Sequence, residues 1–120
     1  MSPTAPEWIT SFLRSVDAGQ HETAFGVFAD DAVLHFGSTT VQGLPAIKKF
    51  MADLGTPREV EHRIRQAWQV DGDHIVRGVA GVPAGGRLDD ADGLAFVQIF
   101  SVGPDGRVTR QRVVFGPPAA

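Results

Sequence analysis

The chain has 120 residues, 42% of them hydrophobic and 21% charged, a composition typical of one soluble globular domain rather than two. Eleven basic against fourteen acidic side chains leave a net charge of −3, and no basic run exceeds Lys48–Lys49, so nucleic-acid binding is not expected. The chain has no cysteine, which excludes disulfides and thiolate chemistry, and no tyrosine, which excludes any mechanism that needs a phenol.

The first twenty residues include Glu7 and Asp17 and contain no unbroken apolar stretch. They predict neither a signal peptide nor a membrane anchor, so a cytoplasmic location and no membrane partner are expected. A chain of this length can bury one core without a disulfide or a metal. We expect a single domain over residues 1–120, with irregular ends at 1–5 and 116–120.

Two helices are predicted at the start of the chain. Thr4 and Glu7 fit a capping box before the first helix, which Gly19 is placed to end. A shorter helix is expected from about His21 to Phe28. Apolar residues with helical spacing support both helices: Ile9, Phe12, Leu13 and Val16 in the first, and Ala24, Phe25 and Phe28 in the second.

A short hairpin and a third helix follow. Residues 32–36 have strand composition, and residues 39–41 suggest a returning strand. Pro45 then lies in the first turn of a helix that Gly55 and Pro57 end. The apolar stripe of this helix consists of Ile47, Phe50, Met51 and Leu54.

From Glu59 onward the apolar spacing changes to strict alternation, which predicts long strands. Further strands are expected over 74–82, 94–102 and 108–115, joined by turns and by a Gly/Asp-rich loop over about 83–93. Consecutive hairpins make an antiparallel sheet, so the chain is predicted to be α+β, with the helices on one face of a curled sheet. The first long strand is expected to place one alternating set on a single face: Val60, His62, Ile64, Gln66, Trp68 and Val70.

This order of elements and several local segments resemble the SnoaL-like and ketosteroid-isomerase-like members of the nuclear transport factor 2 superfamily. The segments are Val16-Asp17-Ala18-Gly19, Phe28-Ala29-Asp30-Asp31-Ala32, Val41-Gln42-Gly43 with Ala46-Ile47 and Phe50, His62 through Trp68, Val70-Asp71-Gly72-Asp73, and Asp105-Gly106-Arg107-Val108 with Phe115-Gly116-Pro117. The resemblance implies a cone-shaped, cystatin-like α+β barrel, in which a strongly curved antiparallel sheet wraps three helices. It also implies a deep apolar pocket for a small molecule, and a homodimer formed through the outer sheet face.

Residues at the ketosteroid isomerase positions differ from that family's pattern. The general base position is occupied by Phe36, the phenolic donor position by Phe12, and the second donor position by Gln98. A phenyl ring can neither remove a proton nor donate one to an enolate oxygen, so steroid isomerisation by that set of residues is not expected.

Polar residues on the predicted inner faces are few. His62 has the side chain type that exchanges protons near neutral pH, so it is the candidate acid or base, with Gln98 and Gln111 as candidate oxyanion donors. A partly buried His62 that only satisfies a neighbouring polar group is the alternative. The predicted substrate-binding residues are Phe12, Leu34, Phe36, Phe50, Gln66, Trp68, Val113 and Phe115.

Other polar residues receive structural interpretations. His35 is expected to be exposed or at an interface, and His21 and His74 to lie on the surface. Asp17 and the pair Asp30–Asp31 are interpreted as capping or turn residues. The loop at 83–93 is interpreted as a solvated tip, with a lid over the pocket as the functional hypothesis. The histidines lack the spacing of a metal site, so neither a metal nor a cofactor is predicted.

Two functions therefore follow from the sequence. The first is a small-molecule enzyme of the SnoaL-like type, which cyclises, isomerises or dehydrates an apolar carbonyl-bearing ring compound. The second is a non-catalytic ligand-binding or dimeric interaction module that keeps the pocket without the acid–base residues. The phenyl rings at the acid–base positions favour the second, and His62 with the pocket amides favours the first.

Overall fold

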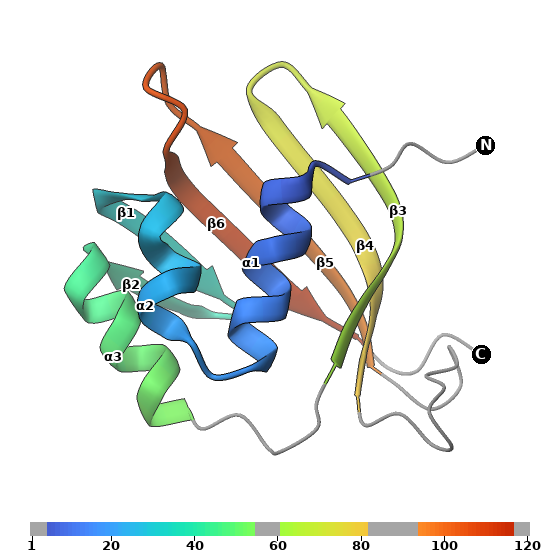
Figure 1. Ribbon diagram of the computed structural model, residues 1–120, viewed down its shortest axis with the longest axis horizontal. Helices are drawn as coiled ribbons and strands as arrows, with labels where there is room; N and C mark the ends of the chain where they lie inside the picture. The colour runs from blue at the N-terminus through green and yellow to red at the C-terminus, as the bar shows by residue number, and fades with distance from the viewer. Residues whose placement is uncertain (1–4, 55–60, 82–93, 117–120) are drawn as a thin grey trace.

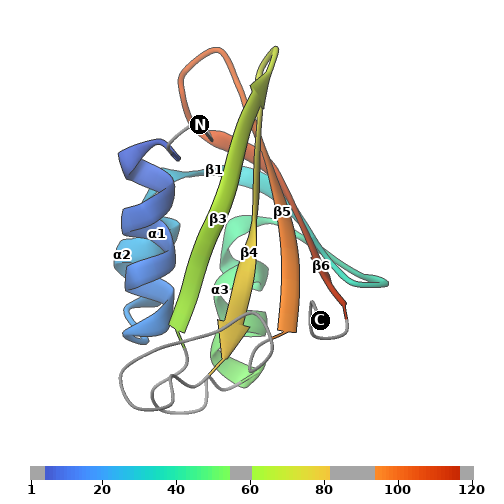
Figure 2. The same cartoon turned by 90° about the vertical axis from the view of Figure 1, so that its right-hand side faces the viewer.

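A computed structural model describes residues 5–54, 61–81 and 94–116. Its elements are α1 (Glu7–Asp17), α2 (His21–Ala24), a 3₁₀ turn (Phe25–Val27), β1 (Phe28–Phe36), β2 (Thr39–Gln42), α3 (Leu44–Leu54), β3 (Glu61–Val70), β4 (Asp73–Gly81), β5 (Leu94–Val102) and β6 (Val108–Phe115). The fold is α+β as predicted: three helices lie on one side of a curved, open six-stranded sheet (Figures 1 and 2). Within these ranges, no helix is long and apolar enough to span a bilayer.

The strand order of the sheet is β2-β1-β6-β5-β4-β3. Every pair is antiparallel except β1 and β6, which run parallel, with Leu34 opposite Gln111. The chain crosses from β2 through α3 to the far edge at β3, then returns strand by strand, so the last strand meets β1 in the same direction (Figure 1). The sheet was predicted to be antiparallel, and it is mixed because of this one parallel pair.

The start of α1 and the end of α2 differ from the predictions. Pro6 is the N-cap of α1 and supplies no side-chain cap, while its carbonyl accepts the backbone N–H of Ile9 and of Thr10. Thr4 of the predicted capping box lies outside the described residues. The second helix stops at Ala24 and a 3₁₀ turn follows, because glycine at position 26 is a poor helix former. Strand β1 therefore begins earlier than predicted, and the pair Asp30–Asp31 lies within it rather than in a junction.

Aromatic rings fill the space between the helices and the concave face of the sheet. The rings of Phe12 and Phe25 are 5.3 Å apart, and those of Phe25 and Phe28 are 4.9 Å apart, both edge to face. Phe100 of β5 meets Phe12 and Trp8 of α1, each with ring centroids 5.5 Å apart. Edge-to-face pairs at these distances add to the energy of burial, so these rings fix α1 against the sheet.

Strand β3 contains a bulge that the alternating sequence did not predict. The register with β4 shifts between Ile64 and Gln66, so Arg65 is an additional residue and the side chains after it change faces. Ala67 is consequently 3% exposed on the inner face, whereas Trp68 is 39% exposed on the outer face. Gln66 also points outward, where it accepts a hydrogen bond from Arg77 at 2.7 Å. The prediction that Gln66 and Trp68 share the face of His62 is therefore wrong.

Gly78 of β4 is opposite this bulge, and the bulge leaves no room for a side chain there. A Cβ at position 78 would lie 1.9 Å from the carbonyl oxygen of Arg63 and 2.8 Å from its carbonyl carbon. Both atoms are backbone, so relief of the clash requires the two strands to move apart.

We expect Gly78→Ala to lower the free energy of unfolding by about 1–3 kcal/mol, the usual cost of overpacking. Urea denaturation followed by circular dichroism measures this loss. Gly26→Ala is the matched control, because a Cβ at position 26 meets nothing within 4 Å. Equal unfolding midpoints for the two variants would contradict the steric account of the bulge.

Candidate active site

Asp17 and His62 form a hydrogen-bonded pair that joins the end of α1 to the start of β3. The Oδ1 atom of Asp17 lies 2.6 Å from Nδ1 of His62, and its Oδ2 accepts the backbone N–H of His62 at 2.9 Å. The side chains are 10% (His62) and 15% (Asp17) exposed, which places the pair near the surface but largely out of water. Both carboxylate oxygens are thus used to hold one residue.

The geometry assigns different roles to the two ring nitrogens of His62. An ionised carboxylate can only accept hydrogen bonds, so the proton of a neutral imidazole is on Nδ1, facing Asp17. The other nitrogen, Nε2, then carries a lone pair, and it makes no hydrogen bond with any residue that the structure describes. Phe96 packs edge to face against the His62 ring, with ring centroids 5.3 Å apart, so one side of the imidazole is in apolar contact. A histidine held in one tautomer by a carboxylate is suited to accept and return a proton.

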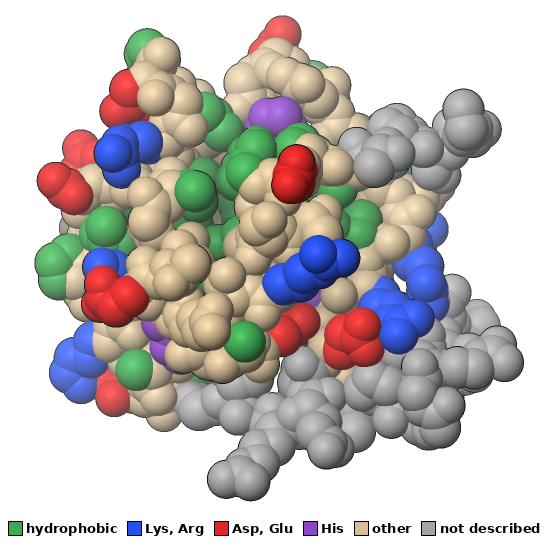
Figure 3. Space-filling model, in the orientation of Figure 1, with side chains coloured by type: hydrophobic (Ala, Val, Ile, Leu, Met, Phe, Trp, Pro, Cys, Tyr) green, Lys and Arg blue, Asp and Glu red, His purple; other side chains and the backbone are tan. Residues whose placement is uncertain are grey.

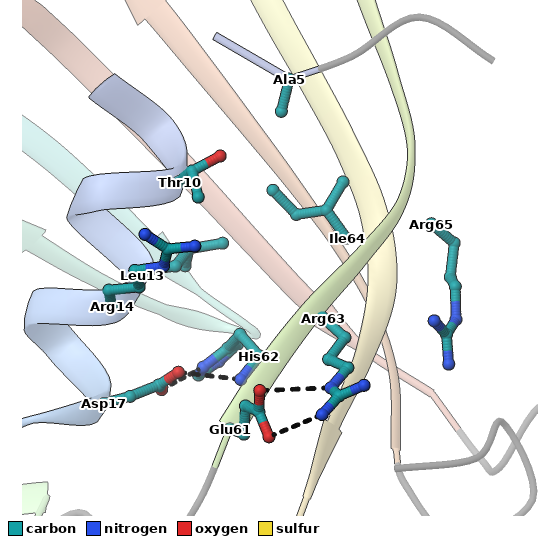
Figure 4. Close-up of a pocket in the computed structure, with 10 residues that line it drawn as sticks. All are labelled: Ala5, Thr10, Leu13, Arg14, Asp17, Glu61, His62, Arg63, Ile64 and Arg65. Atoms are coloured by element: carbon teal, nitrogen blue, oxygen red, sulfur yellow. Dashed lines mark hydrogen bonds and ion pairs between the residues drawn. The ribbon is translucent and has the colours of Figure 1, made fainter. Parts of the chain in front are cut away.

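A groove of about 490 Å³ lies beside this pair, between α1 and the edge strand β3 (Figure 4). Ala5, Thr10 and Ile64 lie in its upper part, and the pair lies in its lower part together with Glu61 and Arg63. In the space-filling view, acidic and basic side chains gather over the lower ends of α1 and β3 (Figure 3). The full lining is Ala5, Thr10, Leu13, Arg14, Asp17, Glu61, His62, Arg63, Ile64 and Arg65.

The second predicted polar group, Gln98 and Gln111, forms a separate pair inside the sheet. Both residues are buried, and Nε2 of Gln111 donates to Oε1 of Gln98 at 2.9 Å. His62 pairs with Ala80, which pairs with Leu94, so Gln98 is two strands across the sheet and four residues farther along β5. At ~4.8 Å per strand and ~3.3 Å per residue, this spacing exceeds any hydrogen bond several times over. The amide pair and His62 are not brought together.

Comparison with known proteins decides the family. The sequence profile of the SnoaL-like domain matches residues 9–111. The chain belongs to the SnoaL-like domain family. No curated protein matches the chain by sequence.

Solved structures with the same fold include relatives of several descriptions. A candidate polyketide cyclase from Sinorhizobium meliloti has a TM-score of 0.73 and 16% identity, over 91% of this chain and 94% of that one. A hypothetical protein with a ketosteroid isomerase-like fold from Catenulispora acidiphila, in complex with trimethylamine, has a TM-score of 0.75 and 16% identity, over 94% of this chain and 88% of that one. SalBIII, an epoxide hydrolase/cyclase-like enzyme in pyran ring formation, has a TM-score of 0.72 and 20% identity, over 92% and 88%. At these identities the likeness shows the fold.

The predicted substrate-binding residues of this SnoaL-like domain lie in different places. Phe12 and Leu34 are buried in the core, and Val113 is buried on the inner face of β6. Phe36 forms an aromatic cluster with Phe50 of α3 and Phe115 of β6, with ring centroids 5.6 and 5.7 Å away. None of these residues lines the groove beside His62. Their assignment to a ligand stays a prediction.

The histidines other than His62 are only partly as predicted. His35 lies within 3.3 Å of the hydroxyl of Thr40 at the β1–β2 hairpin. His21 and His74 are half-buried rather than on the surface, and each has one buried ring nitrogen without a hydrogen-bond partner. His74 is half-buried because Trp8 of α1 packs edge to face against its ring, with ring centroids 5.5 Å apart. Among the described residues, no group of three or more His, Asp or Glu could hold a metal ion.

Asp17 is the site residue that the sequence did not reveal. Its position at the end of α1 suggested a capping role, yet its carboxylate binds a residue 45 positions later in the chain. No local pattern marks this contact, because it depends on how α1 packs on β3. The predicted lid at 83–93 lies outside the described residues.

Proposed function

We propose that this SnoaL-like domain is a small-molecule enzyme in which the Asp17–His62 pair moves a proton on an apolar, carbonyl-bearing ring compound. The observation that carries this proposal is the 2.6 Å contact between Asp17 and Nδ1 of His62, which leaves Nε2 as the proton acceptor. We further propose that the enzyme works in the cytoplasm and needs neither a metal nor a cofactor.

The proposed reaction begins with removal of a proton from the carbon next to the carbonyl group. His62 takes this proton on Nε2, and the electron pair of the broken C–H bond forms an enolate. The imidazolium that results is stabilised by the carboxylate of Asp17. The imidazolium then gives up its proton in one of three ways. Delivery to another carbon of a conjugated enolate gives an isomer, and delivery to a β-hydroxyl group as the C–O bond breaks releases water. Attack of the enolate on a second carbonyl closes a ring, and the alkoxide that forms takes the proton.

The fold neighbours support this class of chemistry. One is described as a candidate polyketide cyclase, and SalBIII as an epoxide hydrolase/cyclase-like enzyme. The description of SalBIII names pyran ring formation, which is a ring closure, and both neighbours share the fold of this chain. The buried amide pair Gln98–Gln111 stays a candidate for binding a polar ligand group within the sheet.

Proton exchange in D₂O tests the proposed chemistry without knowledge of the natural substrate. A panel of cyclic ketones, enones and polyketide-like aromatic ketones is first ranked by thermal shift, because a ligand at 100 times its Kd stabilises by about 2.7 kcal/mol. The best ligands are then incubated with the protein, and deuterium uptake next to the carbonyl is followed by NMR. Faster uptake than in buffer supports the proposal. Ligands that bind without any exchange would instead favour the non-catalytic binding module.

We also propose that the outer sheet face forms a homodimer. In the described part of the chain all helices lie on the other side of the sheet, so nothing described covers this face (Figure 2). Trp68, Ile75 and Ile99 form one apolar row across β3, β4 and β5, and Val97 and Val114 lie in the next. Asp73 and Arg110 lie on opposite sides of β5. A second copy rotated by a half-turn can therefore place acid opposite base.

The outer face predicts a specific oligomeric state. Wild-type protein is expected to elute in light-scattering chromatography with twice the mass of the 12.8 kDa chain. Val114→Glu, at a residue 58% exposed on this face, is expected to give monomer, because a charge buried in an apolar interface is costly. Leu54→Glu, at a residue 50% exposed on α3, is the matched control and should stay dimeric. A monomeric wild type would exclude the dimer.

A further inference from the structure

We propose that the groove between α1 and β3 binds substrates that carry a carboxylate, and that Arg14 is the group that binds it. This inference rests on the proposed function, because it names the substrate class of the same site. The reacting carbon would lie at His62 and the carboxylate about one helical turn farther along α1.

The first argument is that both carboxylates of the groove are already occupied. Asp17 gives both oxygens to His62, one to the ring and one to the backbone. Glu61 gives both of its oxygens to Arg63, at 3.2 and 3.3 Å. Among the described residues, neither acidic side chain of the groove therefore makes a hydrogen bond or an ion pair with Arg14.

The second argument is the guanidinium of Arg14. It is exposed, lines the groove and makes no ion pair or hydrogen bond with any residue of the described ranges. A planar guanidinium binds a carboxylate through two parallel hydrogen bonds, so Arg14 is available to an anion that enters the groove.

The third argument is the alignment of groups along α1. Thr10, Arg14 and Asp17 recur every three or four residues and so lie on one face of the helix, the face that lines the groove (Figure 4). Neighbours at this spacing are about 5–6 Å apart at Cβ, which separates the carboxylate-binding group from the acid–base pair by a few bonds of a ligand. Thr10 adds a hydroxyl beyond Arg14.

The apolar lining defines the rest of the ligand. Leu13 from α1 and Ile64 from β3 face the same space, and Ala5 lies at its upper end (Figure 4). A ligand with one carboxylate and a small apolar body would match this distribution. A neutral hydrocarbon would leave Arg14 without a counter-ion, and a highly charged ligand would place charge against Leu13 and Ile64.

Phenylacetate and its neutral amide, phenylacetamide, provide a matched pair of probes. Titration of the ¹⁵N-labelled full chain followed by NMR is expected to shift the amides of Thr10, Arg14 and His62 with phenylacetate. Arg14→Gln is expected to weaken phenylacetate binding about tenfold and to leave phenylacetamide binding unchanged, since a charge-assisted bidentate contact is lost. Lys49→Gln removes a positive charge from α3, outside both the groove and the outer sheet face, and is expected to change neither.

Several results would overturn this inference: no binding of phenylacetate, equal affinity for acid and amide, or equal weakening by Arg14→Gln and Lys49→Gln. The last result would mean that net charge alone attracts the anion. The inference and the proposed function fail separately. His62→Gln should keep the preference for phenylacetate while proton exchange is lost, whereas His62-dependent exchange of neutral ketones without any carboxylate preference would leave the enzyme and remove the role of Arg14.

Discussion

Replacing His62 with glutamine is expected to slow proton exchange on the ketone panel by about 100- to 10,000-fold, the usual contribution of a positioned acid or base. Glutamine is similar in size and can still hydrogen-bond to Asp17, but it cannot accept a proton at neutral pH. Deuterium uptake measured by NMR, with the same ligands and the same protein concentration, gives the ratio of rates.

His35→Gln is the control for this substitution. It removes a half-buried histidine from β1, outside the groove, and is expected to keep the wild-type rate. If His62→Gln exchanges deuterium as fast as His35→Gln, the catalysis does not depend on His62 and the proposed function is wrong.

Asp17→Asn tests the positioning of His62 by the other member of the pair. The two N–H groups of His62 each meet a different oxygen of Asp17, and an asparagine amide offers an NH₂ group in place of one of these oxygens, so in this geometry one of the two hydrogen bonds is lost. We expect a loss of exchange of about 100-fold or more, because the imidazole is no longer held in one tautomer. The ¹⁵N shifts of the His62 ring report the tautomer directly, which a merely destabilising change would not alter. Asp30→Asn, at an exposed residue of β1, is the control.

Phe100→Ala is expected to give the largest loss of stability, about 3–5 kcal/mol, because it removes a fully buried ring from the core. The substitution empties the position where β5 meets both Trp8 and Phe12 of α1. Urea denaturation measures the loss, and Phe100→Leu keeps the comparison possible if the alanine variant does not fold. Phe115→Ala, at a partly exposed ring, should lose much less. Equal losses at the two positions would contradict the assigned core.

The long strands at the end of the chain could be predicted from the sequence, and the bulge in β3 could not. Alternating residues and the turn at Asp105–Gly106 gave the bounds of β5 and β6 correctly. Arg65 does not reveal the bulge, because a charged residue is equally common at an exposed position of a regular strand and at the additional residue of a bulge. The indication of the bulge lay in the facing strand β4, where Gly78 interrupts the strand sequence. A glycine inside a strand often marks a bulge or a close approach of another backbone.

Some residues of the candidate site could likewise be predicted from the sequence and others could not. His62 could be selected because its chemistry is unusual on an apolar inner face. Its partner Asp17 could not, because the contact spans 45 residues and depends on the packing of a helix on an edge strand. Gln98 and Gln111 were correctly expected to face inward, but their distance from His62 follows from strand register, which alternation alone does not define.

The position of β6 determines when this protein can fold. The last strand in the sequence lies between β1 and β5, so the β1–β2 hairpin has no link to the other strands until residues 108–115 have been synthesised. A nascent chain on the ribosome therefore carries two separate strand groups, each with an open edge. Contacts between distant residues slow folding, so the insertion of β6 between β1 and β5 is expected to be a late step. A truncation before Val108 would leave both strand groups of the remaining chain with an open edge, and so prone to aggregation.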